Sequence, residues 1–194
     1  PGKNAYQIAT WFDLFGASVE INAGLDFTSA SLYALASNVH ETLPLFFRLL
    51  TEPTFSDGEL AQSKAIYIQN LKLNLEKNSF VAGRNIRKNI FGEPHPYGST
   101  LDETPVSVIT SNTLAEYFSK RFSPYEVYVT GPLSESTGNG LIEMLSQLKA
   151  DSASADVNFP VNYHELFEHV EKEDSIQTSI RMGKRSINRT HPHY

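Results

Sequence analysis

The residues most suggestive of chemistry are the two histidines and two glutamates of the string HELFEH, residues 164–169. The helical zinc motifs H-E-x-x-H and H-x-x-E-H place two histidines four residues apart, so that both imidazoles face one ion. Here His164 and His169 are five residues apart, and an α-helix would turn them about 140° from each other. Each histidine still has a glutamate four residues away, but two ligands make a weak site. We therefore expect a solvated junction segment here.

The other histidines and the hydroxyl groups form no catalytic pattern. His95 lies in the string HPYG, and no carboxylate is spaced so as to pair with it in acid or base catalysis. The string therefore predicts a rigid turn. His191 and His193 are two residues apart, which suits one face of a strand, and no third ligand accompanies them. The sequence has no G-x-S-x-G elbow, and the string GNG at 138–140 lacks the Lys-Ser/Thr of a phosphate-binding loop.

Composition and charge exclude several classes of function. The 194 residues carry a formal charge of −6, from 22 acidic and 16 basic residues, which leaves no basic surface for nucleic acid. The absence of cysteine excludes disulfides, thiolate metal sites and a cysteine nucleophile. No apolar run approaches the roughly 20 residues that span a bilayer. These features do not identify a compartment; we expect a soluble protein of the bacterial periplasm or cytoplasm.

The elements that must position any site follow from the periodicity of the apolar residues. Helical spacing, with Asn4 and Ser56 as helix starts, predicts helices over residues 4–16, 39–50, 56–77, 80–91, 111–122 and 136–148. Alternation predicts two antiparallel strands within 17–37, separated by a break at Gly24, and further strands over 125–131 and 175–188. Proline and glycine predict a loop over 92–109.

Helices mixed with antiparallel hairpins indicate an α+β fold, in which helices cover one face of an antiparallel sheet. Residues 151–170 begin with a small, polar, unpatterned string, which predicts a surface linker. The strand that follows would be the first of a second domain, continuing past Tyr194. The initial Pro1 and the abrupt end lead us to expect a piece cut from a longer polypeptide.

Several strings, taken in order, resemble the pitrilysin/insulinase family of zinc metallopeptidases, which includes mitochondrial processing peptidase. They are GASVEINAGLDFT at 16–28, EPTFSDGEL at 52–60, HPYG, and ITSNTLAEYFSKRFSP at 109–124, followed by a strand-like run ending in Gly131. The resemblance covers nearly the whole chain and implies a processing-peptidase-like metallohydrolase fold. It makes residues 1–150 most of one peptidase domain without its zinc-motif segment, 151–170 a linker, and 171–194 the truncated start of a second homologous domain.

The resemblance also implies where a zinc site would lie. Family members bind zinc through two histidines of an inverted H-x-x-E-H helix and a Glu of the later long helix, with a second functional Glu seven residues earlier. Aligned on that helix, Asn70 occupies the position of the ligand Glu and Ser63 that of the second Glu. Neither is an anionic ligand, and zinc sites use His, Cys or carboxylate ligands. A shifted alignment would recruit Glu59 or Glu76, each on a different helical phase.

By this resemblance we expect the non-catalytic half of a pitrilysin-type protein, with no zinc bound by this chain. Such a half supplies chamber wall and contacts to a peptide or protein substrate, to the second homologous domain and to a paralogous catalytic subunit. One alternative is an active zinc endopeptidase whose H-x-x-E-H motif precedes Pro1 and whose third ligand is atypical. Another is a scaffold that binds extended chains without cutting them. Taken by itself, Asn70 could also bond neighbouring side chains on a half-buried helix face.

Overall fold

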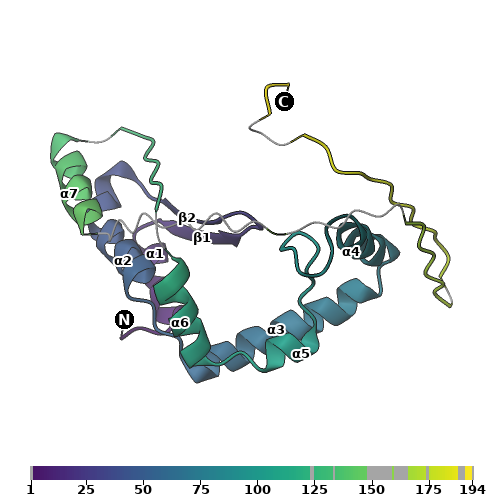
Figure 1. Cartoon of the computed structure of the whole chain (residues 1–194). Helices are drawn as coiled ribbons and strands as arrows, with labels where there is room; N and C mark the ends of the chain where they lie inside the picture. Colours follow the sequence, from purple (N-terminus) through teal and green to yellow (C-terminus); the bar gives the residue numbers. More distant parts are fainter. Residues whose placement is uncertain are drawn as a thin grey trace. The chain divides into compact units, whose positions relative to one another are not determined.

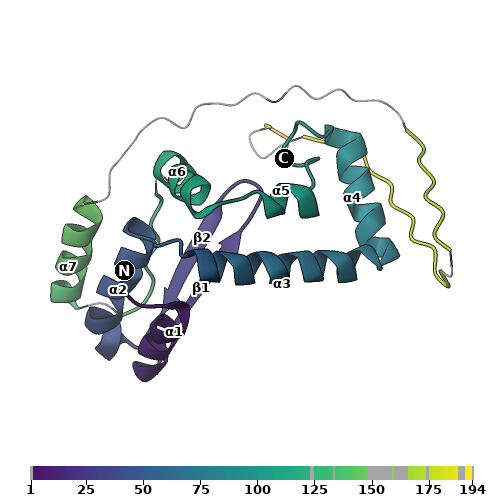
Figure 2. The same cartoon turned by 90° about the horizontal axis from the view of Figure 1, so that it is seen from below.

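The computed structural model describes residues 2–122, 125–132, 134–147, 159, 166–173, 175–187 and 191–193. Its contacts define two compact units, one of Pro1–Leu60 with Thr110–Ala155 and one of Ala61–Ile109 with Asp156–Tyr194. Helix α3 (Asp57–Leu75) begins in the first unit and continues through the second. The elements of both units are labelled in Figure 1, and Figure 2 shows them from below.

The first unit opens with helix α1 (Ala5–Leu14), whose start is fixed by a capping box. The Asn4 side chain accepts a hydrogen bond from the Gln7 N–H at 2.9 Å, and the Gln7 side chain accepts one from the Asn4 N–H at 3.0 Å. These bonds satisfy amides that have no partner within the helix. After the helix, Gly16 takes a φ of 61°, in the left-handed region that glycine adopts without strain. The predicted cap and stop are confirmed.

Strands β1 (Ser18–Ala23) and β2 (Thr28–Tyr33) form an antiparallel hairpin beside α1 (Figures 1 and 2). Val19 pairs with Leu32, and Ile21 pairs with Ala30, so these four apolar side chains share one face of the hairpin. Val19 and Leu32 pack on the core, which anchors that face. The hairpin predicted within residues 17–37 is confirmed.

The core of the first unit lies among α1, the hairpin and helix α2 (Val39–Thr51), which follows a short 3-10 turn at Ala36–Asn38. Its buried apolar side chains are Phe12, Ala17 and Leu45. Thr42 is also fully buried, and its hydroxyl donates to the Asn38 carbonyl at 3.0 Å, so the buried polar group is satisfied.

Helices α6 (Ser111–Arg121) and α7 (Glu135–Ser146) complete the first unit, each starting from a hydroxyl cap, Thr110 and Ser134. The strand predicted over residues 125–131 is wrong, because these residues make no strand pairing. An alternating sequence forms a strand only when a neighbouring strand completes its hydrogen-bond ladder. The sheet in the described part of the chain holds β1 and β2 alone.

In the second unit, α3 is followed by α4 (Asn78–Phe91) and the short helix α5 (Glu103–Ser107). Helix α5 corrects the prediction of a continuous loop over 92–109. The HPYG string forms the predicted turn, in which His95 Nδ1 accepts the Tyr97 N–H at 3.0 Å. Gly98 lies so close to the carbonyl oxygen of Gly92 that a Cβ would clash there, which explains the glycine.

The described residues after α7 form no helix and no strand, so the strand predicted over 175–188 is wrong for residues 175–187. Two parts of the chain after α7 contact α4: Asn89 donates to Glu168 at 2.7 Å, and the side chains of Ile86 and Ile90 approach Gly183. The predicted boundaries at 150 and 170 remain predictions. Helices combined with an antiparallel hairpin confirm the α+β class. No helix in the described part of the chain is long and apolar enough to cross a membrane.

Candidate functional site

Helix α3 is the element that carries both positions singled out by the sequence. It begins after Ser56, whose hydroxyl accepts the Glu59 N–H at 3.4 Å. The return bond of a capping box is absent here, because the Glu59 carboxylate accepts the Ala5 N–H at 2.8 Å instead. Glu59 thereby caps the start of α1, and the Ser56 hydroxyl alone caps the predicted start of α3.

One stripe of α3 is held against the chain that contains α5. Lys64, Tyr67 and Leu71 lie at i, i+3 and i+7, on one side of the helix. We call these three residues the anchoring stripe. Leu71 is buried, and the Tyr67 hydroxyl donates to the Leu101 carbonyl at 3.0 Å. The Lys64 ammonium donates to the Ser107 carbonyl at 2.8 Å and to the Ile109 carbonyl. These bonds satisfy carbonyls at the end of α5, where a cation is favoured.

A second stripe of α3 faces solvent and contains Ser63, Ile66, Asn70 and Leu73, which we call the outer stripe. Ser63 and Asn70 are seven residues apart, within about 20° of each other around the helix, and both are exposed. Ile66 and Leu73 beside them are 51% and 57% exposed. Within the described residues, neither Ser63 nor Asn70 has a side-chain hydrogen-bond partner. The alternative interpretation of Asn70, as a residue that bonds neighbouring side chains, finds no partner in the described part of the chain and stays a prediction.

The carboxylates that could replace these two positions are engaged elsewhere. Glu59 caps α1, and Glu76 lies 3.3 Å from the Lys172 ammonium. Other carboxylates of the second unit form ion pairs: Asp102 with Arg84, Glu103 with Lys72, and Glu93 with Lys88. The hydrogen bond and charge of Glu93 raise the pKa of Lys88 above its ordinary value. A shifted alignment that recruits Glu59 or Glu76 therefore gains no free anionic ligand.

The histidines form no metal centre with these groups. His164 and Glu165 lie outside the described residues, and 166–170 is not helical, so His169 belongs to no helix in the structure. His193 donates its backbone N–H to His191 Nδ1 at 3.1 Å, which closes a local turn. No three His, Cys, Asp or Glu side chains in the described ranges come together as a metal site would require.

The outer stripe does not fit a zinc ion, because a hydroxyl and a carboxamide are neutral and zinc sites are built from imidazole, thiolate or carboxylate. It offers other chemistry. Ser63 and Asn70 can each donate and accept hydrogen bonds, and the exposed aliphatic side chains of Ile66 and Leu73 lie beside them. Alternating polar and aliphatic groups suit contact with main-chain amides and apolar side chains of another polypeptide segment.

Reasoning from the sequence missed the anchoring stripe. Its signal was present, because Lys64, Tyr67 and Leu71 repeat at helical spacing, and a lysine can lie on a packed stripe when its ammonium reaches carbonyl oxygens. What the sequence does not supply is the acceptor, since Leu101, Ser107 and Ile109 lie more than thirty positions further along the chain.

Among solved structures, the chain is similar to the crystal structure of a peptidase M16 inactive domain from Pseudomonas fluorescens. The TM-score is 0.57 at 27% sequence identity, over 60% of this chain and 29% of that chain. This similarity supports a pitrilysin-like, M16-type protein. It also supports a non-catalytic domain, in agreement with the neutral pair on α3. The chain corresponds to less than a third of the matched chain's length. No protein-family model and no curated protein matches the sequence.

Proposed function

We propose that this chain belongs to the non-catalytic half of a pitrilysin-type peptidase, where it forms chamber wall and a surface for a peptide or a partner subunit. The observation that carries the proposal is the outer stripe of α3, on which two neutral side chains, Ser63 and Asn70, stand where the family's two Glu residues are expected. The likeness to an inactive M16 domain supports the same assignment. The paralogous catalytic subunit would supply the zinc and the activated water.

The neutral pair also explains how such a half remains useful without catalysis. A free carboxylate pair on this stripe would repel acidic segments and carry a desolvation cost when covered by another chain. Ser63 and Asn70 avoid that charge cost, while Ile66 and Leu73 provide apolar area to cover. The stripe therefore favours an uncharged stretch of peptide or a partner surface.

The first test is the zinc content of the purified full-length protein. We expect no stoichiometric zinc in the wild type and none after Gln62→Glu with Gln69→Glu, a control pair that is also exposed on α3 and also seven residues apart. If the full-length protein contains the histidine motif, Ser63→Glu with Asn70→Glu should gain zinc. One tightly bound zinc per wild-type chain would instead establish the active-endopeptidase alternative.

The second test is binding of a labelled, uncharged peptide to the full-length protein, alone and with its catalytic partner. Replacing Ile66 and Leu73 by serine should weaken binding by about tenfold, which corresponds to about 1.4 kcal/mol. Ile142→Ser on α7, where the side chain is 67% exposed, serves as the control and should leave the affinity unchanged. Equal affinity in both variants would exclude the outer stripe as the binding surface.

A further inference from the structure

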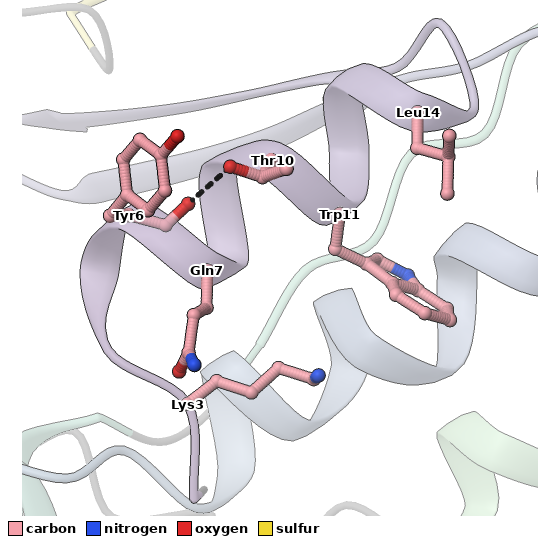
Figure 3. A pocket seen from close by; sticks show the side chains of 6 residues that line it. All are labelled: Lys3, Tyr6, Gln7, Thr10, Trp11 and Leu14. Atoms are coloured by element: carbon pink, nitrogen blue, oxygen red, sulfur yellow. Dashed lines mark hydrogen bonds between the residues drawn. The ribbon is translucent and has the colours of Figure 1, made fainter.

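Helix α1 carries a second apolar face, from which Trp11 alone reaches the core. Ile8 and Phe12 pack toward the core of the first unit. A different side of the helix borders an open groove of about 230 Å³, shown in Figure 3. Its lining side chains are Lys3, Tyr6, Gln7, Thr10, Trp11 and Leu14. We call this surface the α1 groove.

The exposure of the α1 groove is high for side chains of this kind. Tyr6 is 79% exposed and Leu14 is 75% exposed, and they lie eight residues apart with Thr10 midway between them. Positions at i, i+4 and i+8 fall on one side of an α-helix, so these three side chains form a continuous ridge beside the half-buried indole of Trp11. Ridges of this spacing are the surfaces against which a second helix packs.

The charge at one end of the groove is unpaired. The Lys3 ammonium lies 5.3 Å from the centroid of the Trp11 ring, within the range of a cation–π contact. None of the carboxylates in the described part of the chain pairs with it. The indole Nε1–H of Trp11 is buried and likewise has no acceptor among the described residues. An apolar floor with an unpaired cation at its edge is complementary to an apolar side chain followed by a carboxylate.

The backbone of α1 decides between a helical and an extended occupant. An extended segment binds best where main-chain donors and acceptors are free to form a ladder. In α1 most of those groups are bonded within the helix or capped, by Asn4 at the Gln7 amide and by Glu59 at the Ala5 amide. The groove therefore binds chiefly through side chains, which is how helices pack on one another.

We propose that the α1 groove docks an amphipathic helix of a partner polypeptide, with aliphatic side chains against Tyr6 and Leu14 and a carboxylate against Lys3. This contact is independent of the outer stripe of α3. It requires neither zinc nor catalysis.

Trp11 lines the groove and is the single tryptophan of these 194 residues, so the part of the indole fluorescence that Trp11→Phe removes reports on the groove. The probe is a synthetic alanine-rich helical peptide with leucines along one stripe and a glutamate beside them, titrated into the full-length protein. We expect a saturable blue shift. A peptide with lysine in place of the glutamate should bind about tenfold more weakly, and one with a central proline should not bind.

Variants separate the groove from a general affinity for apolar peptides. Leu14→Ser and Tyr6→Ser should each weaken binding, whereas Leu25→Ser, at a site that is 61% exposed but outside the groove, should not. Lys3→Glu should prefer the lysine peptide. Unchanged far-ultraviolet circular dichroism would show that each variant is folded.

Three results would overturn the proposal. The first is equal binding of the glutamate and lysine peptides to the wild type. The second is equal binding of the helical and proline-containing peptides. The third is self-association in sedimentation that Leu14→Ser abolishes, since the occupant would then be a second copy of this protein.

Discussion

Two stripes of helix α3 run side by side and differ in what they touch. The anchoring stripe places Leu71 in a buried position and ties Lys64 and Tyr67 to carbonyl oxygens of the chain around α5. The outer stripe has two exposed aliphatic side chains and two exposed polar ones without partners among the described residues. The anchoring stripe therefore fixes the position of the helix, and the outer stripe is left exposed on its surface.

This difference separates the fold from the site in physical terms. Because Ser63 and Asn70 make none of the bonds that hold α3, the outer stripe can carry neutral or acidic residues at little cost to folding. A helix can thus keep the shape of a peptidase scaffold while Ser63 and Asn70 stand in place of carboxylates. Substitutions in the anchoring stripe should therefore lower the free energy of unfolding much more than substitutions in the outer stripe.

The largest difference is expected between two leucines of the same helix. Leu71→Ala should lower the free energy of unfolding of the second unit by about 2 to 4 kcal/mol, because it removes a buried side chain and leaves a cavity. Leu73→Ala, at a position that is 57% exposed, should cost less than about 0.5 kcal/mol. Urea denaturation of both variants measures the comparison. Equal losses would mean that the outer stripe is packed as well.

A smaller effect is expected at Lys64. Lys64→Met keeps most of the apolar stem but removes the donor to the Ser107 and Ile109 carbonyls. We expect a loss of about 1 to 2 kcal/mol, together with faster hydrogen exchange of the amides of α5. Lys184→Met, at an exposed lysine without a hydrogen bond or ion pair in the described residues, is the control and should change neither quantity. Unchanged exchange in α5 would contradict the anchoring role of Lys64.

The sequence predicted those elements whose signals are local. Asn4 and Gly16 mark the two ends of α1, because a cap and a left-handed glycine act on residues only a few positions away. The break of the hairpin at Gly24 is an equally local signal. The short helix α5 was missed, although Asp102 as N-cap and Pro105 in the first turn mark it. Its signals lie inside a segment whose proline and glycine content suggested a loop.

Features that depend on distant partners could not be predicted in the same way. The alternating runs at 125–131 and 175–187 have the pattern of strands, but pattern alone does not provide the neighbour that completes a ladder. At the site, the shared face of Ser63 and Asn70 followed from their spacing. Their exposure did not, because it depends on which stripe of α3 finds acceptors in the chain around α5.

The smallest effect is expected where the site itself is rebuilt. Ser63→Glu combined with Asn70→Glu should change the free energy of unfolding by no more than about 0.5 kcal/mol, because both side chains are exposed and neither breaks a bond. The two new carboxylates, seven residues apart, would repel each other only weakly through water. Gln62→Glu with Gln69→Glu adds the same charge on another side of α3 and should match it within error. A loss of several kcal/mol confined to the Ser63 and Asn70 variant would show that the outer stripe is covered in the full-length protein, and that the two stripes of α3 both carry the fold.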